Sequence, residues 1–147
     1  MKQTYAGGTA KTSTNRQSLK SIHIPLLDQL QQLPPAILEQ RVRVLLVRMG
    51  YKILEKSDKD GFLILDSLGF HIIYVKIWAF PYAIPGRPYI KSFVGEIIGK
   101  GAHSGLLLTP MWFSGPALEY AEAINPRVIL KDGQGLVQLF TQFGLSI

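Results

Sequence analysis

The spacing of hydrophobic residues near the start of the chain predicts two helices. Apolar residues recur three and four positions apart over residues 25–33 and again over residues 36–49, as in amphipathic helices. Pro34 and Pro35 separate the two segments, because proline ends one helix and fits the first turn of the next. Gly50 is placed to cap the second helix at its C-terminus. We expect the first helix to dock on the body of the protein or on a second copy of the chain.

The spacing then changes to one typical of strands. Residues 51–55, 62–66 and 70–79 are predicted strands, the last of them rich in β-branched and aromatic side chains. Turn residues at Asp60-Gly61 and over residues 67–69 separate these segments. The second and third strands are therefore expected to form a hairpin.

Helical spacing returns at residue 88 and then alternates with short apolar runs. In the first of these helices the apolar side chains share one face, and Lys91, Glu96 and Lys100 are expected to point away from it. The later predicted elements are a strand over 105–109, a helix over 116–124 capped by Ser114, a strand over 127–131, a turn at Asp132-Gly133 and a closing helix around 136–140. The order α-β-β-β-α-β-α-β-α predicts an α/β fold with a mixed β-sheet flanked by helices on both faces.

Length and composition favour one folded domain. The chain has 147 residues, of which 47% are hydrophobic and 18% charged, enough apolar material for a buried core. The absence of cysteine excludes disulfide frameworks, thiolate zinc sites and thiol nucleophiles. We expect a flexible basic tail over residues 1–21, a short amphipathic helical segment over 22–34 and the main domain over 35–147.

The net charge of +6 is concentrated at the start of the chain. Residues 1–20 carry four lysines and arginines and no acid, which leaves a nearly neutral body. Such a tail is either a solvated terminus or a weak contact to phosphates without sequence preference. No apolar run reaches the length of a membrane span and the first residues lack a signal-peptide core, so we expect a cytoplasmic protein without membrane contact.

Three segments, taken together and in order, carry a family resemblance: Leu38-Glu39 before Gly50-Tyr51, then Asp60-Gly61 before an apolar strand, then Tyr74-Val75-Lys76-Ile77-Trp78. They resemble the opening helix, the Asp-Gly-Gly-Ile-Asp segment and the Gln-x-Lys-Arg-aromatic strand of Mrr-like nucleases, a branch of the PD-(D/E)xK restriction endonuclease superfamily. The resemblance covers about residues 36 to 142. It implies a restriction-endonuclease-like fold and DNA as a partner.

The resemblance also implies a catalytic chemistry that can be checked position by position. Such nucleases hydrolyse a phosphodiester with divalent cations held by an Asp and a Glu or Gln, while a Lys assists the attacking water. Lys76 occupies the lysine position, but Ile64 and Tyr74 occupy the two acid positions. An aliphatic side chain cannot bind a cation, and a protonated phenol binds one poorly. The resemblance therefore implies a DNA-binding pseudo-enzyme with a degenerate or inactive nuclease site and no cofactor.

Nearby acids leave a second hypothesis open, that of an active Mg²⁺-dependent endonuclease with displaced acids. In it Lys76, Glu39 and Asp60 are the catalytic residues, and Asp60 and Asp66 bind the metal through their carboxylate oxygens. The simpler interpretation is that Asp60 shapes a turn and Asp66 ends a strand. Whether the chain is an enzyme stays open at this point.

Cationic side chains outside the motifs are the candidate DNA contacts. They lie in the tail, on the helix over 36–49 and around the helix that starts at residue 88, and comprise Lys11, Arg16, Lys20, Arg41, Arg48, Arg87, Lys91 and Lys100. The strand face shared by Tyr74, Lys76 and Trp78 is either a stacking platform for bases or part of the core.

A third hypothesis is a dimeric protein-interaction subunit without nucleic-acid affinity. Its contacts would come from the apolar segment over residues 22–33 and the aromatic loop over 80–89. Gly99-Lys100-Gly101 lacks the remaining residues of a phosphate loop, so no nucleotide cofactor is expected.

Overall fold

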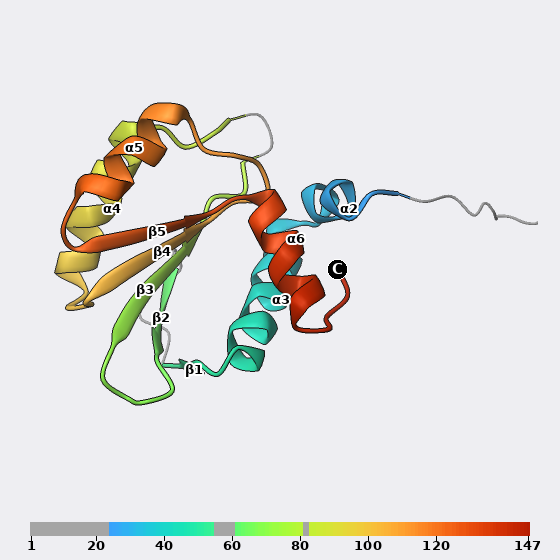
Figure 1. Ribbon diagram of the computed structural model, residues 1–147, viewed down its shortest axis with the longest axis horizontal. Coiled ribbons are helices and arrows are strands. Elements are labelled where there is room, and N and C mark those ends of the chain that lie inside the picture. Colours follow the sequence, from blue (N-terminus) through green and yellow to red (C-terminus); the bar gives the residue numbers. More distant parts are fainter. Residues whose placement is uncertain (1–23, 55–60, 81–82) are drawn as a thin grey trace, which may run out of the picture.

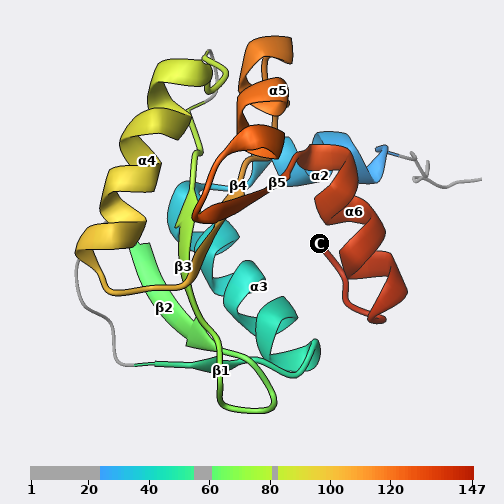
Figure 2. The same ribbon diagram turned by 60° about the vertical axis from the view of Figure 1, so that its left-hand side comes forward.

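The computed structural model describes residues 24–54, 61–80 and 83–147. Its elements, in chain order, are α2 (Leu26–Gln32), α3 (Pro35–Arg48), β1 (Lys52–Ile53), β2 (Gly61–Leu65), β3 (Ile72–Ile77), α4 (Arg87–Gly99), β4 (Ser104–Leu108), α5 (Gly115–Ala123), β5 (Arg127–Lys131) and α6 (Gly133–Gln142). The sheet lies between two groups of helices, with α4 and α5 on one face and α3 and α6 on the other (Figures 1 and 2). The predicted α/β fold with a mixed sheet flanked on both faces is confirmed.

The sheet combines a hairpin with parallel strands in the order β1-β2-β3-β4-β5. Strands β1, β2 and β3 are antiparallel neighbours, whereas β3, β4 and β5 run parallel to one another. In the hairpin, Gly61 pairs with Lys76 and Leu65 pairs with Ile72. This register places Lys76 at the open end of the hairpin and the turn over residues 66–71 at the other end.

Two apolar clusters fill the two sides of the sheet. The α3–α6 cluster consists of Leu30, Leu38, Val42, Leu45, Leu46, Phe62, Ile64, Val75, Leu108, Leu136 and Phe140. The α4–α5 cluster consists of Tyr74, Ile90, Phe93, Ile97, Leu107, Phe113, Ala117, Ala121 and Val128. Burial of these side chains is the main favourable contribution to folding.

Local signals in the sequence set several helix ends. The Ser114 hydroxyl accepts a hydrogen bond from the Ala117 N–H at 3.1 Å, as expected of an N-cap of α5. Asp132 caps α6 in the same way through the Gly135 N–H at 2.9 Å, so the predicted turn at Asp132-Gly133 is the first turn of this helix. Gly50 adopts a φ of +104°, a conformation that favours glycine directly after α3.

Helix α2 docks on the body of its own chain. Leu30 is fully buried in the α3–α6 cluster, and the Gln31 side-chain amide donates to the Pro110 carbonyl at 3.2 Å. None of the helices in the described part of the chain is long and apolar enough to span a membrane.

Candidate functional site

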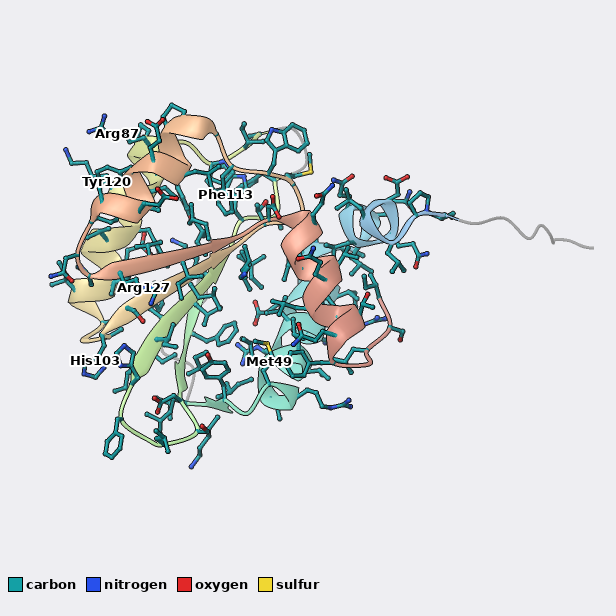
Figure 3. All side chains as sticks on the ribbon, viewed as in Figure 1. Met49, Arg87, His103, Phe113, Tyr120 and Arg127 are labelled. Atoms are coloured by element: carbon teal, nitrogen blue, oxygen red, sulfur yellow. The ribbon has the colours of Figure 1, made fainter. Side chains whose placement is uncertain are left out.

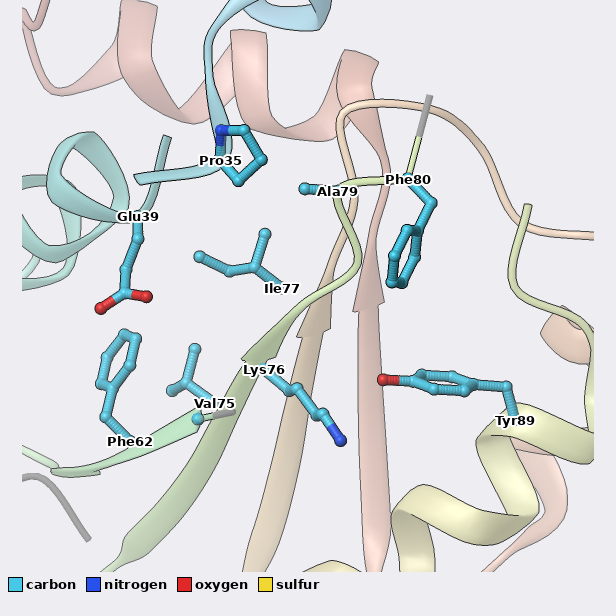
Figure 4. Close-up of a pocket in the computed structure, with 10 residues that line it drawn as sticks. Pro35, Glu39, Phe62, Val75, Lys76, Ile77, Ala79, Phe80 and Tyr89 are labelled. Carbon is cyan, nitrogen blue, oxygen red and sulfur yellow. The ribbon is translucent and has the colours of Figure 1, made fainter. Parts of the chain in front are cut away.

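A pocket of about 380 Å³ opens at the end of the hairpin that carries Lys76, where α3, β2, β3 and α4 come together (Figure 4). We call it the Lys76 pocket. Its lining residues are Pro35, Glu39, Gly61, Phe62, Val75, Lys76, Ile77, Ala79, Phe80 and Tyr89. The structure thus brings Glu39 and Lys76 to one pocket, whereas Asp60 lies outside the described residues.

Lys76 is held by an acid from α4. Its ammonium group donates to both carboxylate oxygens of Glu96, at 2.8 and 3.0 Å, and lies 5.5 Å from the centre of the Tyr89 ring. Burial lowers the pKa of Lys76, but the hydrogen bond that it donates to Glu96 and the electrostatic effects of Tyr89 and Glu96 outweigh it, so that the pKa is raised above 10.5. Lys76 therefore stays protonated near neutral pH and acts there as a fixed cation.

Glu96 is a site residue that sequence reasoning missed. The expectation that Glu96 points away from the packed face of its helix was wrong, because its carboxylate reaches across to β3. It also accepts a hydrogen bond from the Tyr74 hydroxyl at 3.4 Å. Together Tyr74, Lys76 and Glu96 form a small polar group at the margin of the α4–α5 cluster.

Tyr74 is a core residue as well as a polar one. Its side chain is 1% exposed, and its ring stacks on Phe93 with centroids 5.7 Å apart. A Cβ on Gly61 would lie only 2.7 Å from the Tyr74 hydroxyl oxygen, so the phenol occupies space that only glycine leaves open. Of the two interpretations of the Tyr74, Lys76 and Trp78 face, core packing is thus the one that holds for Tyr74.

Glu39 is paired within its own helix. One of its carboxylate oxygens, Oε2, accepts from both Nε and Nη2 of Arg43, each at 2.9 Å. The Arg43 guanidinium in turn lies 4.0 Å from the centre of the Phe62 ring. The negative charge of Glu39 therefore already has a partner of opposite sign.

The two positions that the family resemblance assigns to acids face opposite sides of the sheet. Ile64 is fully buried in the α3–α6 cluster, opposite Ile73 on the neighbouring strand. Tyr74 belongs to the α4–α5 cluster, opposite Leu63. Because side chains alternate between the faces of a sheet, these two positions cannot hold one cation between them in this register.

Asp66 lies at the turn end of the hairpin. Its Oδ1 accepts from the backbone N–H groups of Phe70 at 2.8 Å and His71 at 3.2 Å. Partial desolvation raises the pKa of Asp66, but hydrogen bonds from the backbone of His71, Phe70 and Gly69 together with the charge of His71 keep it below its ordinary value. A strand rise of about 3.3 Å per residue separates Asp66 from the Lys76 pocket by about 16 Å. The structure does not bring Asp66 to Lys76.

The residues that the structure describes do not fit a divalent cation. Glu39 is paired with Arg43 and Glu96 with Lys76, and no group of three His, Asp or Glu side chains within the described ranges is arranged as metal ligands. Mg²⁺ needs several oxygen ligands that converge on one point. We therefore derive no catalytic step through a metal.

Two of the predicted DNA contacts, Arg41 and Arg48, make hydrogen bonds within the chain. Arg41 donates to the backbone carbonyl oxygens of Ile147 at 2.6 Å and Ser146 at 3.4 Å. Arg48 donates to the Phe143 carbonyl at 3.0 Å. Both arginines hold the segment after α6 against α3, which supports a structural role.

The other predicted DNA contacts have different surroundings. Figure 3 shows Arg87 beside Tyr120 at the outer surface, and the Arg87 guanidinium lies 5.1 Å from the centre of that ring. Lys91 is exposed on α4. The half-buried Lys100 lies 5.8 Å from the Tyr74 ring centre. The remaining predicted contacts, Lys11, Arg16 and Lys20, lie outside the described residues.

Comparison with known proteins supports a relationship over most of the chain. Residues 30–140 match the family model of the Mrr catalytic domain, described as a restriction endonuclease. The chain is 29% identical over 127 residues to a type IV methyl-directed restriction enzyme, EcoKMrr, from Escherichia coli (strain K12). This match covers 80% of the present chain but 41% of that enzyme, so the chain spans less than half of its curated relative.

Proposed function

The chain belongs to the restriction endonuclease family defined by the Mrr catalytic domain, and from this premise we propose that it is a DNA-binding protein whose nuclease site is degenerate. The packing of Ile64 and Tyr74 is the observation that supports a degenerate nuclease site. One occupies the α3–α6 cluster and the other the α4–α5 cluster, each at most 1% exposed. A cation would need polar oxygen ligands at these positions.

The family and the charge of the chain support DNA as the partner. The relative is named as a restriction enzyme, and the present chain has a net charge of +6. Arg87 and Lys91 are exposed and one turn apart on α4, so they can reach neighbouring phosphates without breaking a contact in the core. We assign the phosphate contacts of the described chain to this pair.

A gel-retardation series with duplex DNA at several salt concentrations tests the binding. We expect a complex that weakens as salt rises, because released counterions drive the association. The double variant Arg87→Gln/Lys91→Gln should bind more weakly and lower the salt slope by about 2, one for each lost phosphate contact. The matched control is Lys52→Gln/Arg127→Gln, which removes two exposed cations elsewhere. No retardation at low salt would refute DNA binding.

A cleavage assay on the same sample tests the degenerate site. Supercoiled plasmid should remain intact in Mg²⁺ and in Mn²⁺. Nicking that depends on the metal and disappears in Lys76→Ala would refute the inactive site.

One observation favours the alternative of an active Mg²⁺-dependent endonuclease with displaced acids, namely that Glu39 and Lys76 line the same pocket. In that case Asp60 would supply a further carboxylate. The alternative requires plasmid cleavage that is lost in Asp60→Ala as well as in Lys76→Ala, together with Mg²⁺ binding in a calorimetric titration. Absence of both signals would eliminate it.

A further inference from the structure

We propose that the Lys76 pocket binds a single unpaired nucleobase. This inference rests on the proposed function and deepens it by naming what the pocket holds.

The charged groups around the pocket cancel in pairs. The Glu39 carboxylate is 2.9 Å from the Arg43 guanidinium, and the Lys76 ammonium is 2.8 Å from the Glu96 carboxylate. Because each charge is already paired, neither a phosphate nor a metal ion finds an unpaired counter-charge among these four groups. A neutral ring with polar edges needs none, so the charge balance favours a base over both ions.

Aromatic and apolar side chains form the walls of the pocket. Figure 4 shows the rings of Phe80 and Tyr89 on the same side of β3 as the Lys76 side chain, whereas Glu39 and Phe62 lie on the other side. A cavity of about 380 Å³ lies within the range that binds small organic molecules, and a base is small enough to enter it.

The exposed ring of Phe80 is held in place by Trp78. Phe80 is 61% exposed, yet its ring meets Trp78 edge to face with centroids 4.9 Å apart. Trp78 also meets Tyr89 edge to face at 4.4 Å, and its indole N–H donates to the Ala83 carbonyl at 3.0 Å. An exposed ring that already packs on a neighbour is suited to stacking, because that contact reduces the conformational entropy lost when a base covers the ring.

A polar group at the pocket suits the edge of a base. The Lys76 ammonium lies beside the aromatic wall, and base carbonyls and ring nitrogens accept hydrogen bonds from such a donor. In a duplex both faces of each base are stacked on neighbours, so only an unpaired or extruded base can lie against Phe80.

Fluorescence anisotropy with a labelled single-stranded oligonucleotide and with its duplex tests the proposal. We expect Phe80→Ala to weaken binding of the single strand about 10-fold, within the range of one lost stacking contact. Binding of the duplex should change less than about twofold, because the duplex presents no unpaired base. Phe80 is mostly exposed, so this variant is expected to fold, and circular dichroism checks that it does.

The chain offers a matched control in Phe70, which is 78% exposed at the turn end of the hairpin. Phe70→Ala should leave binding of both DNA forms unchanged. The inference would be overturned if Phe80→Ala caused no loss of single-strand binding, or if Phe70→Ala caused an equal loss. The proposed function would still stand in that case, provided that the protein binds the duplex. Failure of the unmodified protein to bind either form would refute the proposed function itself.

A fluorescent base and a free nucleoside separate two sources of the ligand. A 2-aminopurine within the single strand should change its emission on binding to the unmodified protein but not to Phe80→Ala. Calorimetric titration with deoxynucleosides should give no binding in the micromolar range, because the backbone contacts are missing. Tight binding of a free nucleoside would overturn the assignment to a base within a nucleic acid.

Discussion

The two faces of the sheet give residues of the same hairpin different surroundings, apolar on one face and partly charged on the other. On the α3–α6 side, Ile64 lies in an apolar cluster that offers a charged group no partner. On the α4–α5 side, Lys76 keeps its charge because Glu96 reaches it from the facing helix. At these two positions, the lysine has a counter-charge from an adjacent helix, and the position without such a partner holds an apolar residue.

Under the proposed function, this difference gives a physical reason why an isoleucine at position 64 is compatible with the fold. An acid at position 64 would need a bound cation or another counter-charge to offset its desolvation. Isoleucine at this position removes that requirement and adds apolar burial to the cluster shared by α3 and α6. In the structure, the counter-charge of Lys76 comes from Glu96.

The largest effect on stability is expected when an acid is placed on the apolar face. Ile64→Asp should destabilise the protein by about 3 to 5 kcal/mol, because it leaves an unpaired carboxylate in a fully buried position. Urea unfolding monitored by circular dichroism measures this loss. Millimolar Mg²⁺ should not restore the stability.

Ile64→Val serves as the control for that substitution. It removes one methylene group and should cost about 0.5 to 1.5 kcal/mol. A folded Ile64→Asp variant that gains stability from Mg²⁺ would mean that position 64 still faces a competent metal site.

A smaller effect is expected on the polar face. Glu96→Gln removes the counter-charge of Lys76 and should cost about 1 to 2 kcal/mol, between the values for exposed and buried pairs, because Glu96 is a third exposed. The double variant Glu96→Gln/Lys76→Met should lose less than the sum of the single variants, since both remove the same interaction. Urea unfolding of the four proteins gives the coupling energy.

The pH dependence of this pair has a defined sign. The pKa of Lys76 is raised above 10.5, so the contribution of its charge to stability is present below pH 10.5 and is lost as the pH rises above it through the folded value.

The control for Glu96→Gln is Glu119→Gln, which removes an exposed acid from α5 and should change the free energy of unfolding by less than about 0.5 kcal/mol. Purely additive effects of Glu96 and Lys76 would contradict the coupling.

Local signals in the sequence predicted most of the fold. The hairpin of β2 and β3, the cap at Ser114 and the glycine after α3 each depend on residues close together in the chain, and each is confirmed. The strand over residues 127–131 has the predicted bounds. Backbone preferences act over a few residues, so a single sequence is enough to locate these features.

The site was less predictable because its contacts join distant segments. Glu96 is 20 residues from Lys76, and helical spacing alone cannot tell how far α4 reaches across the sheet. Arg41 was predicted to bind DNA, yet it contacts a carbonyl 106 residues away. The sequence shows which face of a helix carries a charge, but tertiary packing decides which group that charge meets.

The smallest expected effect lies at the turn end of the hairpin, where Asp66 closes the loop between β2 and β3. The pKa of Asp66 is lowered, so its stabilising contribution is present above pH 3.8 and is lost as the pH falls below it through the folded value. Thermal melts between pH 7 and pH 3, an interval of about 4 units that spans the ordinary carboxyl pKa, should show a shallower acid loss in Asp66→Asn than in the unmodified protein.

Asp28→Asn on α2 makes the same change of charge at an exposed position and should not alter that slope. The comparison also separates the two roles considered for Asp66. A metal ligand would make the melting temperature rise with Mg²⁺ in the unmodified protein and not in Asp66→Asn. If Asp66 is a turn residue, Mg²⁺ changes the melting temperature of neither protein. We expect this result, because the carboxylate already accepts two backbone hydrogen bonds.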